Sequence, residues 1–312
     1  MPFIGGKELA TEPKQLSNRF AINFSDLSLD DAGEWPDLLE ILRKKVKPHR
    51  DRLGGYSVAI RRRDFWWQYG TYTPALYRAI SGLERVLAIS RITTYIAFAF
   101  APAHTVFNEK VIVLPARAGT RDFAVLSSRL HELWALMWGT TLGETPNYSP
   151  PDCFETYPFP SNFEVDPVLE AAGEAYQAFR AQLMVARNEG LTKTYNRFHA
   201  RGENAADIAR LRTLHHEMDV AVLRAYARGA SSEDDASGWN DLADRAAPEF
   251  IEQDADEGKT PKTRLDWPSD FKDEVLARLL ALNATRAAEE RAAGLVAVDD
   301  GDNEDVEEGD TE

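Results

Sequence analysis

Three short segments with the composition of β-strands lie close together in the middle of the chain. They are RVLAIS (85–90), TTYIAFAFA (93–101) and KVIVLP (110–115). Each is rich in β-branched and aromatic residues, and they are separated by Arg91-Ile92 and by a turn-like stretch from Pro102 to Glu109. We therefore predict an α+β fold in which a few short strands are flanked by helices.

Helices are predicted on both sides of the strands from apolar residues at helical spacing. One runs from Trp35 to Val46, with Pro36 in its first turn and an end near Pro48. A short helix is expected from Pro74 to Leu83. Further helices are predicted over 123–137, ending at Gly139, and over 169–183, 208–226 and 271–293.

These elements predict five parts of the chain. The first is a mixed αβ domain over 1–146, followed by an ordered, Pro-rich and aromatic connector over 147–165. A helical domain is predicted over 166–230, and an acidic linker with a C-terminal helix over 231–296. The last part, 297–312, has the composition of a disordered acidic tail. Within the connector, Tyr157, Phe159 and Phe163 are expected to pack the hinge.

Composition narrows the class of protein. The chain has 312 residues, of which 44% are hydrophobic, so it is long enough to bury a sizeable core. Its single cysteine, Cys153, cannot form an internal disulfide, and the first residues lack the apolar core of a signal peptide. No run is long enough to cross a bilayer. The expected location is the cytoplasm, without contact with a membrane.

Charge is distributed unevenly along the chain. Residues 1–230 carry a net charge of plus 2, and residues 231–312 carry minus 17, which together give the total of minus 15. Between Arg43 and Arg91 there are twelve Lys and Arg but three Asp and Glu, a net charge of plus 9. The acidity therefore belongs to the C-terminal part, and the N-terminal part contains a strongly basic segment.

Motifs for several common chemistries are missing from the sequence. There is no Gly-rich nucleotide fingerprint, no phosphate-binding loop and no His and Cys spacing typical of a zinc site. Cys153 as a nucleophile would need an activating base that the sequence does not identify. His215 shares a helix face with Leu211 and Met218 and is predicted to be a core or interface histidine. No catalytic residue and no metal ligand is assigned.

The basic segment has two interpretations that its composition leaves equally open. It can be an ordinary solvated face, or it can follow the phosphate backbone of a nucleic acid. Trp66, Trp67, Tyr69 and Tyr72 are interleaved with the bases, and a groove of cations with aromatic groups is typical of nucleic-acid binding.

Several runs of the sequence resemble a known family. They include DFWWQYG, LERVLAISRITTYIAFAFAP, FNEKVIVLP, FAVLSSRLHELWA, YSPPDCFETYPFP and ARNEGLTKTYNRFHA. In this order, over about residues 3–230, they are similar to the C-terminal half of MmeI-like adenine-specific DNA methyltransferases of restriction-modification systems. DEVLARLLALNATRAAEE resembles the final helix of some members. The resemblance implies that 1–146 is a target recognition domain and that the protein acts on double-stranded DNA.

The sequence also departs from the family's pattern. Members carry a methyltransferase domain with a Gly-rich S-adenosylmethionine loop and an Asn-Pro-Pro-Tyr type motif, and neither is found here. Tyr148-Ser149-Pro150-Pro151 has Ser where the amide is needed, and no cofactor loop precedes it. We expect no cofactor in this chain. S-adenosylmethionine would bind to a separate or missing catalytic domain, and a catalytic methyltransferase chain or domain would be the protein partner.

The resemblance leads to a division of labour among polar residues. Phosphate contacts would fix position, and a few side chains would read base edges in the major groove. Base readout is assigned to the junction between two predicted strands, at Arg91, Thr93, Thr94 and Tyr95. Phosphate contacts are assigned to Arg43, Lys44, Lys47, Arg61, Arg62, Arg63, Lys193 and Arg197. For Arg91, a structural salt bridge is an equal alternative, and for 188–199 a structural role is favoured.

Two functions from different classes remain open. The first is DNA recognition for an adenine-specific methyltransferase in restriction-modification or phage defence. The second is a non-catalytic protein-interaction module or a remnant of a broken methyltransferase gene. The plus 9 segment favours the first, and the acidic C-terminal part weakens it. The acidic tail could aid solubility or compete with DNA for the basic segment.

Overall fold

The computed structural model describes residues 1–17, 19–70, 73–143, 145–253 and 263–294, and the predicted acidic tail lies outside them. The α+β fold class is confirmed. The strands are β1 (Phe3–Ile4), β2 (Arg85–Ser90), β3 (Ala99–Pro102), β4 (Val106–Phe107), β5 (Val111–Leu114), β6 (Thr140–Leu142), β7 (Thr145–Asn147), β8 (Glu249–Glu252) and β9 (Thr263–Asp266). The helices are α1 (Gly6–Thr11), α2 (Leu29–Ala32), α3 (Pro36–Lys45), α4 (Lys47–Arg50), α5 (Ser57–Asp64), α6 (Pro74–Ala79), α7 (Thr120–Leu126), α8 (Arg129–Trp138), α9 (Pro167–Arg187), α10 (Leu191–His199), α11 (Ala206–Arg228), α12 (Glu233–Arg245) and α13 (Ser269–Ala292).

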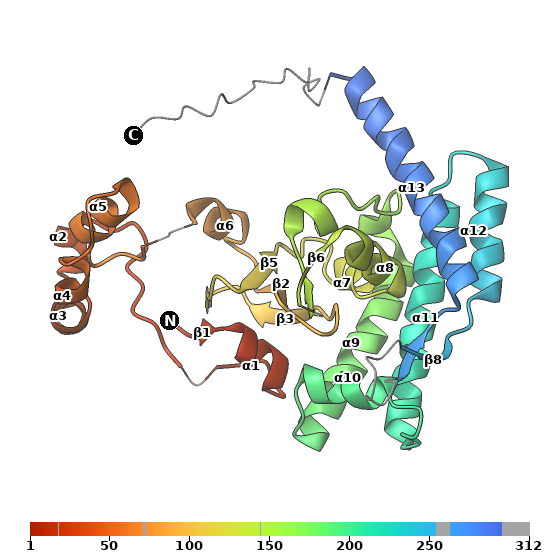
Figure 1. Cartoon of the computed structure of the whole chain (residues 1–312), viewed down its shortest axis with the longest axis horizontal. Coiled ribbons are helices and arrows are strands. Elements are labelled where there is room, and N and C mark those ends of the chain that lie inside the picture. The colour runs from red at the N-terminus through yellow and green to blue at the C-terminus, as the bar shows by residue number, and fades with distance from the viewer. Residues whose placement is uncertain (18, 71–72, 144, 254–262, 295–312) are drawn as a thin grey trace, which may run out of the picture.

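A small lobe, Phe20–Gly70, stands at one end of the molecule and contains α2 to α5 (Figure 1). Its core is a cluster of apolar side chains in which Leu39, Trp66 and Trp67 are buried. The indole Nε1 of Trp67 donates a hydrogen bond of 2.9 Å to the carbonyl of Leu27. The lobe thus has its own small core, separate from the core under the sheet.

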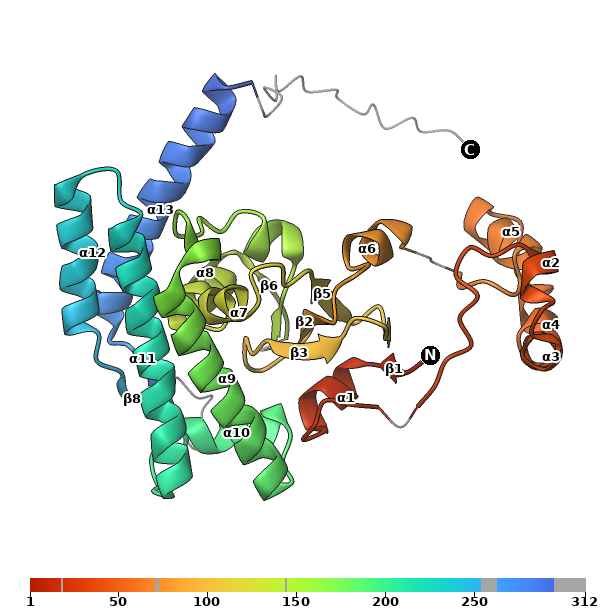
Figure 2. The same ribbon diagram turned by 180° about the vertical axis from the view of Figure 1, so that it is seen from behind.

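The central sheet has three antiparallel strands in the order β3-β2-β5. Leu87 in the middle strand pairs with Phe100 on one side and Leu114 on the other. Four consecutive residues of β2, Val86–Ile89, are buried, because helices and loops cover both faces of the sheet. Figure 2 shows α6 between this sheet and the small lobe.

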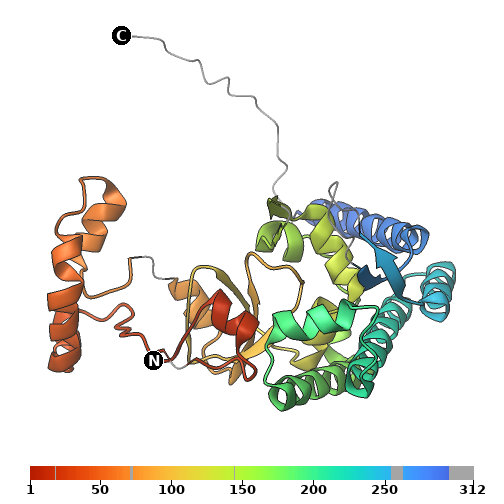
Figure 3. The same ribbon diagram turned by 60° about the horizontal axis from the view of Figure 1, so that its bottom comes forward.

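The helical region, α9 to α13, packs on the other side of the sheet (Figure 3). One continuous apolar cluster includes Leu87 from β2, Phe123 from α7 and Leu279 from α13. The sheet and the helical region therefore share one core. The prediction that His215 is a core histidine is confirmed, since its Nδ1 lies 3.1 Å from Asp219 Oδ2 and 3.0 Å from an Arg129 nitrogen.

The second predicted strand, 93–101, is mostly wrong. Only Ala99–Pro102 forms a strand, and 93–98 runs as a loop, because its polar groups find other partners. Thr93 donates its N–H to Pro146, and its hydroxyl donates to the carbonyl of Tyr95. The carbonyl of Phe98 accepts from the buried guanidinium of Arg180. The loop is thereby fixed to the chain around β7 and α9.

Two further predictions are corrected. The single helix over 123–137 is broken into α7 and α8, because the hydroxyl of Ser128 accepts from the N–H of His131 and caps a new helix. The acidic linker predicted in the first part of 231–296 contains α12 and β8 in its described residues. Its acids occupy the first turn of α12, where they complement the helix dipole, and Trp239 stacks on Tyr226 with ring centres 4.6 Å apart.

The other predicted elements are confirmed with small shifts of their ends, as for α3, α6, α9, α11 and α13. In the aromatic connector, the hydroxyl of Tyr226 donates to that of Tyr157, and Phe159 stacks on Phe163. Among the residues that the structure describes, no helix is long and apolar enough to cross a membrane.

Candidate nucleic-acid interface

A basic cleft of about 640 Å³ lies between the small lobe and the edge of the central sheet. The small lobe contributes His49 and Arg50, the last two residues of α4, and Arg62 from α5. From the sheet side come Arg91, directly after β2, and Asn108 and Glu109 in the turn before β5. The cleft thus unites Arg62 and Arg91, which were assigned to phosphate contact and base readout and lie 29 positions apart in the sequence.

Arg50 and Arg62 place two positive charges on the small-lobe side of this cleft. One terminal nitrogen of Arg50 donates to the carbonyls of Arg62, Phe65 and Gln68, at 3.4, 3.1 and 2.6 Å. Burial, followed by the charges of Arg62 and Arg61, lowers the pKa of Arg50. Within the described part of the chain, no carboxylate pairs with Arg50 or Arg62. These two arginines therefore form no ion pair here, and the carboxylate that lines the same cleft, Glu109, comes from the sheet side.

Arg91 sits on a rigid support. Its N–H donates to the carbonyl of Lys110 at 2.8 Å, and its carbonyl accepts from the N–H of Tyr148 at 2.7 Å. The neighbouring Ile92 bridges to Asn147. The side chain of Arg91 is exposed at the cleft, and no hydrogen bond or ion pair engages its guanidinium among the described residues. The alternative of a structural salt bridge at Arg91 finds no partner in this part of the chain.

The other predicted phosphate contacts of the small lobe lie on its exposed helices. Arg43 and Lys44 both reach Glu40, at 3.2 and 3.3 Å, and Lys47 reaches Asp51 at 2.9 Å. Arg63 lies 3.7 Å from Asp64, and the guanidinium of Arg61 covers the ring of Phe65. Exposed pairs of this kind contribute little to stability, so a phosphate could replace the carboxylate at small cost.

The aromatic residues of the basic segment do not lie as predicted. Trp66 and Trp67 belong to the core of the small lobe and are 7% and 9% exposed, so they cannot stack on a nucleic acid. The free energy gained by burying these two indole rings decides their position, although basic residues surround them in the sequence. Tyr69 does line the cleft, whereas Tyr72 lies outside the described residues.

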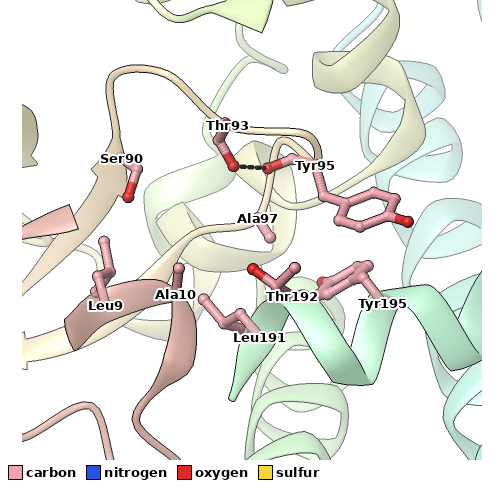
Figure 4. Close-up of a pocket in the computed structure, with 9 residues that line it drawn as sticks. All are labelled: Leu9, Ala10, Ser90, Thr93, Tyr95, Ala97, Leu191, Thr192 and Tyr195. Carbon is pink, nitrogen blue, oxygen red and sulfur yellow. Dashed lines mark hydrogen bonds between the residues drawn. The ribbon is translucent and has the colours of Figure 1, made fainter. Parts of the chain in front are cut away.

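Thr93 and Tyr95 line a different pocket, together with residues of α1 and α10 (Figure 4). The space between them holds about 20 Å³, room for a water molecule rather than a base. The hydroxyl of Tyr95 donates to Asn196, and its ring stacks on His199 with centres 5.1 Å apart. Thr94 is exposed. The four predicted readout residues therefore do not form one cluster, and their assignment stays a prediction.

Lys193 and Arg197 differ in how free their charges are. Arg197 pairs with Glu189 at 2.9 Å and with Glu203 at 2.8 Å, and these carboxylates raise its pKa. Lys193 is exposed and pairs with no carboxylate of the described residues. Asn196 and His199 of this segment contact the sheet loop and β9, and the assignment of Lys193 and Arg197 to phosphate contact stays a prediction.

The residues around Tyr148 do not fit a flipped-base or cofactor site. Tyr148 is 1% exposed, and its hydroxyl lies 3.0 Å from His131 Nε2. Burial raises the pKa of the Cys153 thiol, so its nucleophilic form is disfavoured. This segment is part of the core.

Sequence reasoning missed His49, Arg50, Gly70, Asn108 and Glu109 as cleft residues. Arg50 was counted among the bases but lay beyond the predicted end of a helix at Pro48. The only sequence signal for Arg50 as a cleft residue was therefore its position in the expected turn after that helix. Which turns meet across a cleft depends on tertiary packing.

Comparison with known proteins identifies the family. The sequence model of the MmeI target recognition domain matches residues 1–161, which include the small lobe and the sheet. A solved structure of the type IIL restriction-modification enzyme MmeI in complex with DNA matches with a TM-score of 0.52 at 19% identity. The match covers 76% of this chain and 29% of that chain, so the protein spans less than a third of the enzyme's length.

No curated protein matches the chain. Because the sequence identity to the solved structure is low, that similarity supports the fold alone. The family match, in contrast, covers more than half of the sequence. The chain therefore belongs to the family of the MmeI target recognition domain.

Proposed function

We propose that this protein binds double-stranded DNA through the basic cleft and recognises sequence for an adenine-specific DNA methyltransferase. The observation that carries the proposal is the cleft itself, where Arg62 and Arg91 face one space from two parts of the fold without carboxylate partners in the described residues. Arg62 would neutralise a phosphate. Arg91, on its rigid support, would read a guanine.

The chemistry of methyl transfer would come from a catalytic part that is not among these residues. S-adenosylmethionine supplies the methyl group there, on a separate or missing catalytic chain. The sequence lacks the cofactor loop, and Tyr148 is engaged in the core, which supports this division. We further propose that the protein works in the cytoplasm, in restriction-modification or phage defence.

Duplex binding by the full chain tests the proposal. Fluorescence anisotropy with a labelled random-sequence duplex would be measured between about 50 and 200 mM salt. If about four phosphates are neutralised, affinity should fall by about a hundredfold over this range, because bound counterions are released. Binding that is absent at the lowest salt, or unaffected by salt, would contradict the proposal.

A second function is favoured by a different surface. An apolar groove of about 360 Å³ on the small lobe is lined by Phe20, Trp35 and Leu38, which are 76%, 46% and 39% exposed. Exposed apolar patches mark protein contacts. If the protein does not bind DNA, a protein-interaction function becomes the favoured hypothesis. Trp35→Ser should then abolish binding to a catalytic methyltransferase chain while leaving the fold intact.

A further inference from the structure

Gly70 lies against the side chain of Arg62 at the cleft. A β-carbon built at Gly70 would lie 2.6 Å from Arg62 Nε and 3.1 Å from its Cγ and Cδ. Contacts this short do not occur, so any side chain at this position would displace Arg62. The backbone of Gly70 has no positive φ, and alanine is therefore acceptable to the main chain. The need for glycine here comes from the arginine alone.

Arg62 is held in an unusual way for a surface arginine. Its Nε is buried and has no hydrogen-bond partner in the described residues. Its main-chain carbonyl accepts from Arg50, the second cation that lines the same wall of the cleft. Two guanidinium groups on one wall without a carboxylate repel each other, and an anion between them would relieve this repulsion.

We propose that Gly70 is a positioning residue, which gives Arg62 the space to join Arg50 in one phosphate-binding subsite of the cleft. This inference rests on the proposed function, since the phosphate is that of a DNA backbone. Arg62 and Arg50 would donate to the phosphate oxygens. Gly70 touches no phosphate and acts through Arg62.

The experiment compares Gly70→Ala, Arg62→Ala and their double variant with the unchanged full chain, using the same labelled duplex over a range of salt. Gly55→Ala is the matched control, because a β-carbon at Gly55 meets nothing within 4 Å in the same lobe. We expect Gly70→Ala and Arg62→Ala each to weaken binding by about tenfold at low salt. Each should also reduce the slope of log affinity against log salt by about 0.9.

The double variant shows whether Gly70 acts through Arg62. It should bind like Arg62→Ala alone, and Gly55→Ala should bind like the unchanged chain. If Gly70→Ala does not fold, the double variant still carries the test, because removing Arg62 removes the clash. A double variant that binds more weakly than Arg62→Ala would overturn the inference.

The outcomes separate this inference from the proposed function. If the unchanged chain shows no salt-dependent binding to the duplex, both the proposed function and this inference are overturned. If it binds, but Gly70→Ala keeps full affinity and slope, the positioning role is overturned while DNA binding stands. If it binds and Arg62→Ala has no effect, the subsite is overturned and contact with DNA lies elsewhere.

Discussion

Arginine has different surroundings in the helical region and in the cleft. Arg129 of α8 is 3% exposed and pairs with Asp219, which is buried in the helical region, and Arg187 of that region pairs with Asp207 at 2.7 Å. Arg212 donates to the carbonyls of Arg197, Phe198, Ala200 and Glu203. These arginines have protein partners that satisfy their charge or their N–H groups.

The cleft shows the opposite arrangement. Arg62 and Arg91 line the cleft and form no ion pair with a carboxylate of the described residues, although Glu109 lines the same cleft. The difference teaches that a count of basic residues is a poor guide to binding. What distinguishes an arginine available to a ligand from one that stabilises the fold is whether the fold already supplies a counter-charge or acceptors for its N–H groups.

The largest effect is expected when a partner is removed from the helical region. Asp219→Asn leaves the buried Arg129 without its main counter-charge and should lower the free energy of unfolding by about 3–5 kcal/mol. Urea unfolding measures this change. Asp244→Asn is the matched control, because its pair with Arg224 is exposed and should contribute less than about 1 kcal/mol. Equal losses in both variants would break the comparison.

A smaller effect, on binding instead of stability, is expected in the cleft. Arg91→Ala should change stability by less than about 0.5 kcal/mol, since its guanidinium has no protein partner to lose. It should cost about 1–3 kcal/mol in affinity for a preferred sequence selected from random DNA. Arg62→Ala should weaken binding to preferred and random DNA alike. Equal losses on both DNAs for Arg91→Ala would end its assignment to base readout.

The sequence predicts local features of this molecule better than distant ones. The strands β2 and β5 and helices such as α9 and α11 were predictable because side-chain spacing alone specifies them. The helix α12 was missed because its acidic first turn and its Gly and Ser have the composition of a linker, although Trp239 and Leu242 have helical spacing. Composition outweighed periodicity in that prediction.

The same limit applies to the candidate site. Pairs such as Lys47 with Asp51 follow from a spacing of four residues on a helix. In contrast, Arg129 and Asp219 are 90 positions apart, and nothing in their local sequences indicates the pair. Sequence alone therefore gives the charges of the cleft but not which of them are left unpaired.

The last predicted effect concerns Asp122 of α7, a partly buried carboxylate that forms no ion pair with the described residues. Burial raises the pKa of Asp122 to about 6, although its Oδ2 accepts from the N–H of Ala118 at 2.7 Å. At Asp219, burial acts in the same direction, but the charges of His215 and Arg129 outweigh it and lower the pKa. Asp122 thus resembles Arg62 and Arg91 in having no ion-pair partner among the described residues.

Because the pKa of Asp122 is higher in the folded protein than its ordinary value of 3.8, folding is favoured by the protonated form. The stabilisation is complete below about pH 3.8 and is lost as the pH rises through about 6. Asp122→Asn, which stays neutral, should therefore become more stable relative to the unchanged chain between pH 4 and pH 8, by about 2 kcal/mol. Urea midpoints at both pH values measure this. A difference that does not change with pH would show that the pKa of Asp122 is not raised in the folded protein.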